Sequence, residues 1–297
     1  MTDSSQVAPE IRAGFFSLSM PYWLKQLLRH RLSVVGGAYV LIVVIAGALA
    51  PVLATHDPAA FDLPAKFSGP SMDHLLGADY LGRDQFSRLL YGARISIVVG
   101  IFSVIIAALI GVPLGLIAAY FGGWTDHAIM RFIDAKMAIP GVILAILLLL
   151  VLGGGVLTVS IALGINLSSA QARLIRSQAL SVKEREYFAA ARAMGVSTWR
   201  LIFLHMMPNS IQPVIVQASL GVGFAVLGEA SLSFLGVGVP PSTPTWGNML
   251  KLSFDSIRSA GHLTYAPGLA IFFLVLGFSF VGDGLRDVLD PRLKGKI

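Results

Sequence analysis

The sequence predicts an all-α, polytopic membrane protein with six transmembrane helices. Apolar residues make up 55% of the 297 residues and charged residues only 13%, whereas soluble domains carry about 25% charged residues. The mean hydropathy is +0.76. The apolar residues occur in runs of the ~20 residues that a helix needs to cross a bilayer, and these runs are too long and too uniform for barrel strands. These observations exclude a disordered chain and an ordinary soluble enzyme.

The gaps between charged residues define the six helices. The expected spans are residues 32–53, 95–120, 128–152, 156–172, 208–235 and 263–281. Three consecutive glycines from Gly153 separate the third span from the fourth. Pro113 and Pro140 lie inside spans and predict kinks, because proline removes a helical hydrogen bond. Residues 1–21 are mixed and lack the short apolar core of a signal peptide.

The distribution of Lys and Arg predicts the orientation, because cytoplasmic segments of bacterial membrane proteins are enriched in these residues. With the N-terminus inside, 14 of them lie on the cytoplasmic side and six outside, leaving out Arg131 and Lys136 at a span edge. We therefore expect a multi-pass protein of the bacterial cytoplasmic (inner) membrane with both termini in the cytoplasm. Topology then explains the net charge of +6, and nucleic-acid binding is not expected.

Three polar segments connect the spans: residues 54–94 outside, 173–207 inside and 236–262 outside. None is large enough to form a catalytic domain of its own. Four charged residues mark an amphipathic stretch at the end of the first segment: Arg83, Asp84, Arg88 and Arg94. An anchor at the membrane interface is favoured for this stretch over a brace at an outer gate.

Two further sets of residues belong to the span edges. Trp124 and Trp246 are expected at the membrane interface, where tryptophan is enriched. Asp134 lies three residues after Arg131, so the two are candidates for an ion pair on one helix face. A snorkelling cytoplasmic end of the third span explains the same charges and is favoured.

No enzyme motif is present. The sequence lacks a GxxxxGK[ST] phosphate loop, an HExxH pair and a GxSxG elbow. It has no cysteine, and six histidines are scattered without metal-ligand spacing: His30, His56, His74, His127, His205 and His262. We therefore expect a non-catalytic chain that binds no metal and no cofactor of its own.

The most informative segment is residues 181–209, SVKEREYFAAARAMGVSTWRLIFLHMMPN. It predicts two short helices, residues 183–194 and 198–207. Gly195 ends the first helix, because glycine adopts the left-handed conformation at little steric cost, and Ser197 is the expected N-cap of the second. The smooth, alanine-rich surface of the first helix suits docking into a groove of another protein. An amphipathic helix that lies on the membrane surface is the alternative.

This segment resembles the EAA loop in the inner-membrane permease subunits of binding-protein-dependent ABC importers. The family pattern is E-A-A, three residues, Gly, nine residues, Ile-x-Leu-Pro. It falls on Ala189, Ala190, Ala191, Gly195, His205, Met207 and Pro208. Three of these positions depart from the pattern, with Ala for Glu, His for Ile and Met for Leu. His and Pro-Asn at this place are usual in the peptide branch of the family.

Three other stretches are similar to the C-type subunit of the dipeptide, oligopeptide and nickel branch. They are HLLGADYLGRDQFSRLLYGARIS at 74–96, EASLSFLGVGVPPSTPTWGNML at 229–250 and GDGLRDVLDPR at 282–292. With the EAA-like loop, the four motifs stand in the family's order. Ordered motifs are much more specific than a single short match.

The resemblance implies a type I ABC importer permease with a MetI-like core. Residues 1–94 would comprise the cytoplasmic N-terminus, the first helix and an extracytoplasmic segment. The core would be residues 95–285, with five helices and the cytoplasmic loop 173–207, followed by a tail at 286–297. Such a subunit forms half of a translocation pathway with a B-type permease subunit. Two ATP-binding subunits, which hold ATP and Mg, dock beneath, and an extracytoplasmic substrate-binding protein delivers the substrate.

The resemblance also implies which residues couple the chain to the ATPase. They are Lys183, Glu184, Glu186, Ala189, Ala190, Ala191, Gly195, His205 and Pro208. ATP-driven closure of the ATPase pair would move this loop and switch the helices between two states.

The fifth span is unusually small and polar. Candidates for lining the pore or the gate are Gln217, Ser219, Glu229, Ser231 and Ser233. Small residues equally favour close packing against the partner permease, and Glu229 equally fits a helix-end carboxylate that reaches water. Peptides are the expected substrates. Nickel chelates, glutathione, opines and sugars are alternatives within the branch, and a self-contained secondary transporter is the alternative outside it.

Overall fold

A computed structural model describes residues 30–289, and this part of the chain is helical with one isolated β-bridge between Ala78 and Asp84. The helices in the first half are α2 (Arg31–Ala48), α3 (Ala50–Leu53), η1 (Leu63–Ala65), α4 (Gln85–Phe121), α5 (Gly123–Met137) and α6 (Gly141–Leu152). Those in the second half are α7 (Val156–Lys183), α8 (Glu186–Ala193), α9 (Thr198–Arg200), η2 (Leu201–Met206), α10 (Met207–Ser210), α11 (Gln212–Phe234), α12 (Trp246–Asp255), α13 (Ile257–Ala260), η3 (Gly261–Thr264) and α14 (Tyr265–Leu289).

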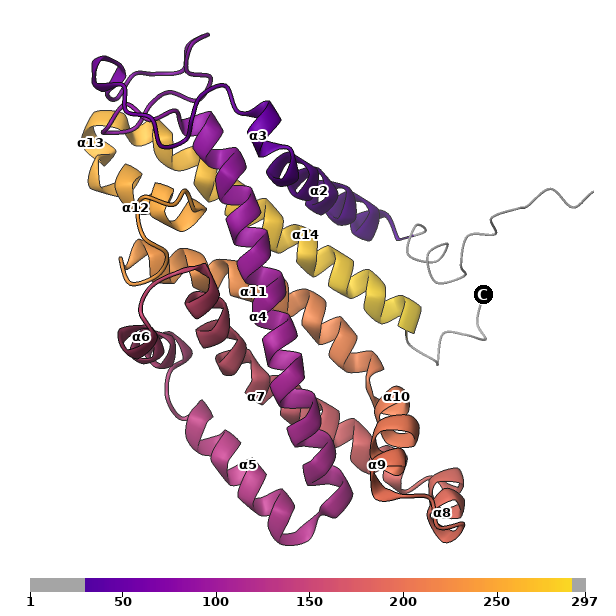
Figure 1. Ribbon diagram of the computed structural model, residues 1–297. Coiled ribbons are helices and arrows are strands. Elements are labelled where there is room, and N and C mark those ends of the chain that lie inside the picture. The colour runs from indigo at the N-terminus through magenta and orange to yellow at the C-terminus, as the bar shows by residue number, and fades with distance from the viewer. Residues whose placement is uncertain (1–29, 290–297) are drawn as a thin grey trace, which may run out of the picture.

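The long helix α4 runs through the middle of an elongated bundle (Figure 1). It packs along α7 on one side and contacts α11 and α2, while α14 lies between α2 and α11. Helices α4 and α7 approach each other closely. A Cβ added at Gly115 would lie 2.3 Å from the carbonyl oxygen of Ala172, so only glycine permits this distance between the two backbones.

The expected count of six helices is roughly consistent with the structure, with one correction. Within residues 30–289, four stretches are long and apolar enough to cross a membrane: Arg31–Ala48, Gln85–Phe121, Gln212–Phe234 and Ile257–Leu289. The bent pair α5 and α6 makes a fifth if it is one span. The expected third span, residues 128–152, is not one helix, because α5 and α6 meet at an angle of 91°. Pro140 stands at this bend as the N-cap of α6 and has no N–H to continue α5.

The fourth expected span is longer than predicted. The sequence suggests residues 156–172, but α7 continues to Lys183. Its last turns keep an apolar face of Ile175, Ala179 and Val182, which are buried against Leu116 and neighbouring residues of α4. Packing on α4 therefore extends the helix beyond the purely apolar run, even though charged residues stand on its other face.

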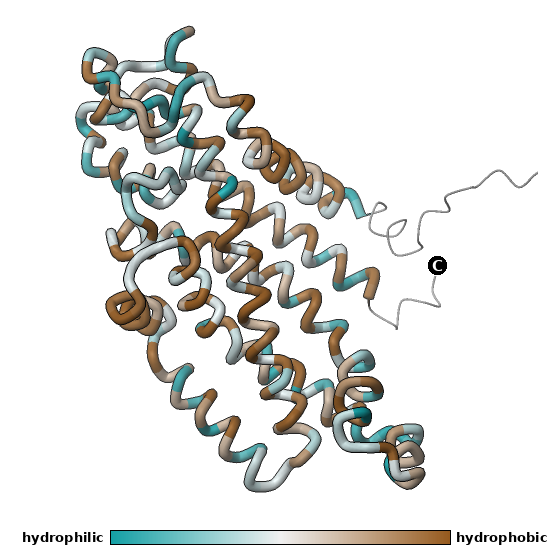
Figure 2. Tube along the Cα trace, in the orientation of Figure 1, coloured by the Kyte–Doolittle hydropathy of each residue, from teal (hydrophilic) through white to brown (hydrophobic). Residues whose placement is uncertain are grey.

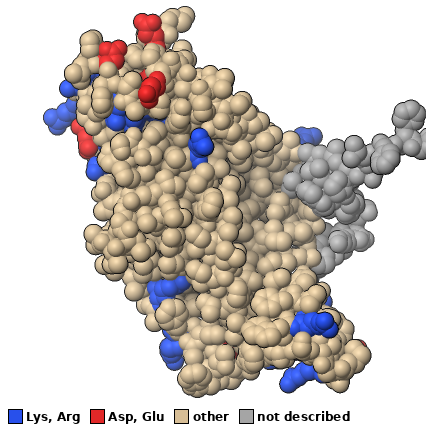
Figure 3. Space-filling model, viewed as in Figure 1, with Lys and Arg blue, Asp and Glu red and all other residues tan. Residues whose placement is uncertain are grey.

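Hydropathy follows the long axis of the bundle. The tube in Figure 2 is predominantly brown along α4, α11 and α14 and more polar at the two ends. On the face shown in Figure 3, Lys and Arg gather near both ends, and most Asp and Glu lie at the end that carries residues 54–84. The middle of that face is almost free of charge. This is the surface expected of a multi-pass membrane protein.

Candidate functional site

The connection from α7 to α11, residues 184–211, projects from one end of the bundle. It comprises α8, α9, η2 and α10, and it lies at the end opposite to residues 54–84 (Figure 1). The two polar regions that the sequence singles out are therefore on opposite ends of the membrane-crossing helices.

Gly195 ends α8 as predicted. It adopts φ +75°, and its N–H donates to the carbonyl oxygen of Arg192 at 3.1 Å. The next N–H, of Val196, donates to the carbonyl oxygen of Ala191 at 3.3 Å. These two hydrogen bonds form a Schellman motif, in which the residue at the position of Gly195 must be left-handed.

The second predicted helix, residues 198–207, has a different internal structure. After one α-helical turn, residues Leu201–Met206 form a π-helix, and α10 follows. Ser197 is the N-cap of this helix, as predicted. Ser197 has the extended backbone of an N-cap, but its hydroxyl makes no cap hydrogen bond. Only its carbonyl oxygen is used, as the acceptor for the Leu201 N–H at 2.9 Å.

Helix α8 has one buried and one exposed face. Phe188 and Ala191 are buried in a cluster that also contains Leu201 and Met206 of η2 and Leu116 of α4. The exposed face includes several predicted docking residues: Glu184, Glu186, Ala189, Ala190 and Gly195. The structure therefore joins a free alanine surface to the α4–α7 core through packed side chains.

Large apolar side chains extend this exposed surface. Met194 is 77% exposed, Trp199 60% and Leu204 65%. The Trp199 ring stacks on Phe203, with ring centroids 5.9 Å apart. Several large apolar side chains exposed at a polar end of a protein are typical of a surface that another protein covers. The sequence reasoning selected the alanines and missed these larger residues.

The remaining predicted docking residues, Lys183, His205 and Pro208, lie outside the exposed face of α8. The ammonium group of Lys183 points inward and donates to the carbonyl oxygens of Ala119 and Tyr120, at 3.0 and 2.7 Å. These carbonyls are at the C-terminal end of α4, where a cation is favoured. His205 is half-buried, and its carbonyl oxygen accepts from the Asn209 side chain at 2.7 Å. Pro208 is exposed in the first turn of α10.

Charged residues attach α5 to α7. Asp126 pairs with Arg176, and Lys136 donates to the Ser168 hydroxyl at 2.8 Å. Asp134 pairs with Arg173 of α7 and not with Arg131, the neighbour suggested by spacing. These contacts fix the side of α5 that faces α7, while α6 exposes much of its apolar surface beyond the bend.

The polar residues of α11 divide into two groups. Gln217, Ser219 and Ser231 are half-buried, whereas Glu229 and Ser233 are fully buried. The Ser233 hydroxyl donates to the Glu229 carboxylate at 2.8 Å and accepts from the Val239 N–H at 3.3 Å. The buried pair therefore ties the end of α11 to the following loop. A lining role stays a prediction for all five residues.

Residues 54–84 form a folded loop on the start of α4. The guanidinium of Arg83 donates to the Asp79 carboxylate at 2.7 Å, and Arg88 donates to the carbonyl oxygen of Pro58 at 3.0 Å. Arg83, Asp84 and Arg88 are all buried, so the prediction of an interfacial anchor is wrong for these three. Each finds a partner within the loop because the chain folds back over the helix end.

Trp246 also differs from its prediction. Trp124 is exposed as expected of an interfacial residue, but Trp246 is buried and donates its indole N–H to the carbonyl oxygen of Leu89 at 2.9 Å. It therefore joins α12 to α4 instead of facing the lipid headgroups.

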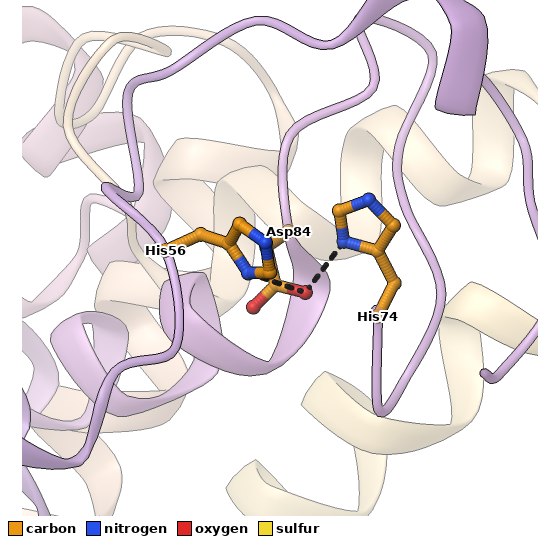
Figure 4. Close-up of side chains that lie close together, drawn as sticks. All are labelled: His56, His74 and Asp84. Atoms are coloured by element: carbon orange, nitrogen blue, oxygen red, sulfur yellow. Dashed lines mark hydrogen bonds and ion pairs between the residues drawn. The ribbon is translucent and has the colours of Figure 1, made fainter. Parts of the chain in front are cut away.

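Asp84 is the centre of this loop. Its carboxylate accepts from the Ser87 N–H at 2.7 Å as the N-cap of α4 and from His74 Nδ1 at 3.0 Å. Burial alone would raise the pKa of Asp84, but the bonds from Ser87 and His74 and the nearby His56 hold that pKa below its usual value. His56 and His74 flank the carboxylate (Figure 4). Sequence spacing did not indicate this group, because its members come from separate turns of a loop.

The fold defines a class of protein: a multi-pass membrane protein with a partly exposed helical connection at one end. Residues 111–295 match the family model described as a binding-protein-dependent transport system inner membrane component. Residues 22–70 match the N-terminal transmembrane domain of oligopeptide transport permease C. The chain therefore belongs to the family of binding-protein-dependent transport permeases.

Individual relatives agree with this family. The glutathione transport system permease protein GsiD of Pectobacterium atrosepticum is 42% identical over 92% of this chain and 91% of the relative. The dipeptide transport system permease protein DppC of Alkalihalophilus pseudofirmus is 42% identical over 91% of this chain and 89% of its own length. The MetNI methionine ABC transporter, solved in inward-facing conformations, has a similar fold. It has a TM-score of 0.55 and 18% identity, covering 68% of this chain and 96% of that chain.

Proposed function

We propose that this chain is the C-type permease subunit of an ATP-driven importer for peptides. It forms half of the translocation pathway with a B-type permease subunit. ATP is hydrolysed on two separate ATP-binding subunits, and an extracytoplasmic binding protein delivers the substrate. The observation that carries the proposal is the α8 surface, which is exposed on one side and anchored in the core on the other.

The anchoring supports a mechanical role for α8. Phe188 lies in the same buried cluster as Leu116 of α4 and Ile175 of α7. A displacement of α8 by a bound ATPase would therefore press directly on the two longest helices of the bundle. ATP binding performs work in this scheme because the docked ATPase has a different geometry in each of its two states.

The same proposal assigns the orientation. The end that carries α8 is cytoplasmic, where ATP is available, and residues 54–84 face the binding protein outside. The excess of Lys and Arg in the segments next to α8 supports this choice. Both termini are then cytoplasmic. The exposed apolar surface of α6, at Val142, Ile143 and Leu147, is the face proposed to meet the partner permease.

Peptides are proposed as the substrate class because the relatives carry dipeptides and glutathione, which is itself a tripeptide, according to their names. Gln217, Ser219 and Ser231 of α11 are the proposed polar contacts along the pathway, since they are only half-buried in this subunit. The binding protein selects among peptides. Its ligand, measured with the purified protein, distinguishes peptides from nickel chelates, opines and sugars.

Two substitutions test the coupling in the assembled transporter. Ala190→Glu places a charged, longer side chain on the exposed face of α8, and Gly195→Pro forces φ to about −65° where the structure requires a positive value. Both should abolish ATPase stimulation by the loaded binding protein while the subunit stays in the membrane. Ala190→Ser is the matched control and should retain stimulation. Normal stimulation in both Ala190→Glu and Gly195→Pro would refute the assignment.

A further inference from the structure

Three potential metal ligands meet at the start of α4. His56 follows α3, His74 lies in the middle of residues 54–84, and Asp84 is the N-cap of α4. One ligand atom from each lies within 4.8 Å of the other two. The Asp84 Oδ1 atom is 3.0 Å from Nδ1 of His74 and 3.9 Å from Nδ1 of His56. Figure 4 shows the two imidazole rings on either side of the carboxylate.

We propose that these three residues bind a divalent transition-metal ion of the zinc type. Two imidazoles and one carboxylate are a common ligand set for Zn²⁺, which takes tetrahedral geometry with metal–ligand distances of about 2.0–2.2 Å. Ligand atoms in such a tetrahedron are about 3.3 Å apart. The His74–Asp84 distance is near this value. The His56 ring has to move inward, by roughly 0.6 Å toward Asp84 and by up to roughly 1.5 Å toward His74, since the three ligand atoms lie within 4.8 Å of one another. Its exposed position at the surface allows this movement.

The surroundings hold two of the ligands in place. The other carboxylate oxygen of Asp84, Oδ2, accepts from the Ser87 N–H at 2.7 Å and from the Thr55 hydroxyl at 3.3 Å. Oδ1 faces the two histidines and accepts from His74 Nδ1 at 3.0 Å, so binding of an ion there would release this proton from the ring. The Nε2 atom of His74 faces the Asp62 carboxylate at 3.9 Å. A carboxylate that accepts from the second ring nitrogen usually orients a metal-binding histidine. At 3.9 Å Asp62 makes no hydrogen bond to His74, and it would have to approach the ring to fill this role.

Solvent reaches the site from one side. The side chains of His74 and Asp84 are buried, whereas that of His56 is 42% exposed. An ion therefore has a path of entry and a fourth position for water. Once bound, it joins the beginning and the middle of residues 54–84 to the start of α4. The ion would act as a clip for this loop, because closing a loop removes conformational freedom from the unfolded chain.

The test uses the full chain in lipid nanodiscs, stripped of metal with a chelator that is then removed. Titration with Zn²⁺, and with Co²⁺ for its visible spectrum, should give one site per chain with a tetrahedral cobalt spectrum. His56→Ala and His74→Ala should each weaken binding at least about tenfold. His127→Ala is the matched control, since this exposed histidine lies in α5 at the other end of the bundle, and it should bind as the wild type does.

A second measurement guards against misfolding. Zn²⁺ should raise the melting temperature of the wild type and of His127→Ala but not of His56→Ala, whose exposed side chain is removed without disturbing the buried Asp84 contacts. The proposal is overturned if the wild type binds neither ion. It is also overturned if His56→Ala folds and binds with unchanged affinity, because the metal then lies elsewhere.

Discussion

Replacing Gly195 with alanine isolates the conformational requirement at the end of α8. The residue has φ +75°, and a Cβ added there would meet nothing within 4 Å. Steric contact with other residues therefore adds no cost. The remaining cost is that of placing an L-residue in the left-handed region, roughly 1–2 kcal/mol. Helix α8 has only eight residues, and the stability of so short a helix is marginal. The loss of free energy at Gly195 therefore destabilises the whole of α8.

This cost converts into a measurable change in local opening. A loss of roughly 1–2 kcal/mol multiplies the population of the opened α8 by roughly 5 to 30. Hydrogen exchange of the amides in Glu186–Ala193 should accelerate by that factor, while exchange in the centres of α4 and α7 stays unchanged. Exchange followed by mass spectrometry on the reconstituted chain resolves the two regions.

Gly153→Ala is the matched control. Gly153 has φ +82° and also has open space around its Cβ position, but it lies between α6 and α7. Its ψ of 164° puts it in a region open essentially only to glycine, so alanine costs at least as much there, without contact to α8. Unchanged exchange in α8 of Gly195→Ala would refute the Schellman argument. Equal acceleration of α8 in both variants would show a global loss of stability and would refute it as well.

Two further predictions concern α4 and α7. Gly115→Leu should lower the melting temperature, at a cost of about 1–3 kcal/mol or more, because its Cβ would lie 2.3 Å from the Ala172 carbonyl oxygen. Gly223→Ala, whose Cβ has only ordinary contacts with Val275, is the control. Equal melting temperatures of Gly115→Leu and the wild type would contradict the packing argument. Lys183→Met keeps the aliphatic stem but removes the donors to Ala119 and Tyr120, so it should cost about 1–3 kcal/mol of stability in a denaturation assay. Glu184→Gln next to it is exposed and should cost little, and an undiminished stability of Lys183→Met would speak against the inward contact.

The six-helix pattern and the end of α8 follow from rules that act within a short stretch of chain. A bilayer requires about 20 apolar residues in succession, and this requirement locates α2, α4, α11 and α14 from composition alone. A Schellman end requires a residue that tolerates a positive φ, and Gly195 marks it. Ala189 and Ala190 are exposed as the sequence predicts, but the neighbouring Ala191 is buried, because consecutive residues of a helix point in different directions.

Only the tertiary structure decided which charged and aromatic residues are exposed. Arg83 and Arg88 have the spacing of a surface helix, yet they are buried because residues 54–84 fold over the start of α4 and supply Asp79 and a backbone carbonyl. Trp246 is buried for a similar reason, since a distant helix provides the acceptor for its indole N–H. His56, His74 and Asp84 meet through loop turns that no local pattern specifies. Contacts between residues far apart in the chain depend on how the whole bundle packs, and a short sequence motif does not specify that packing.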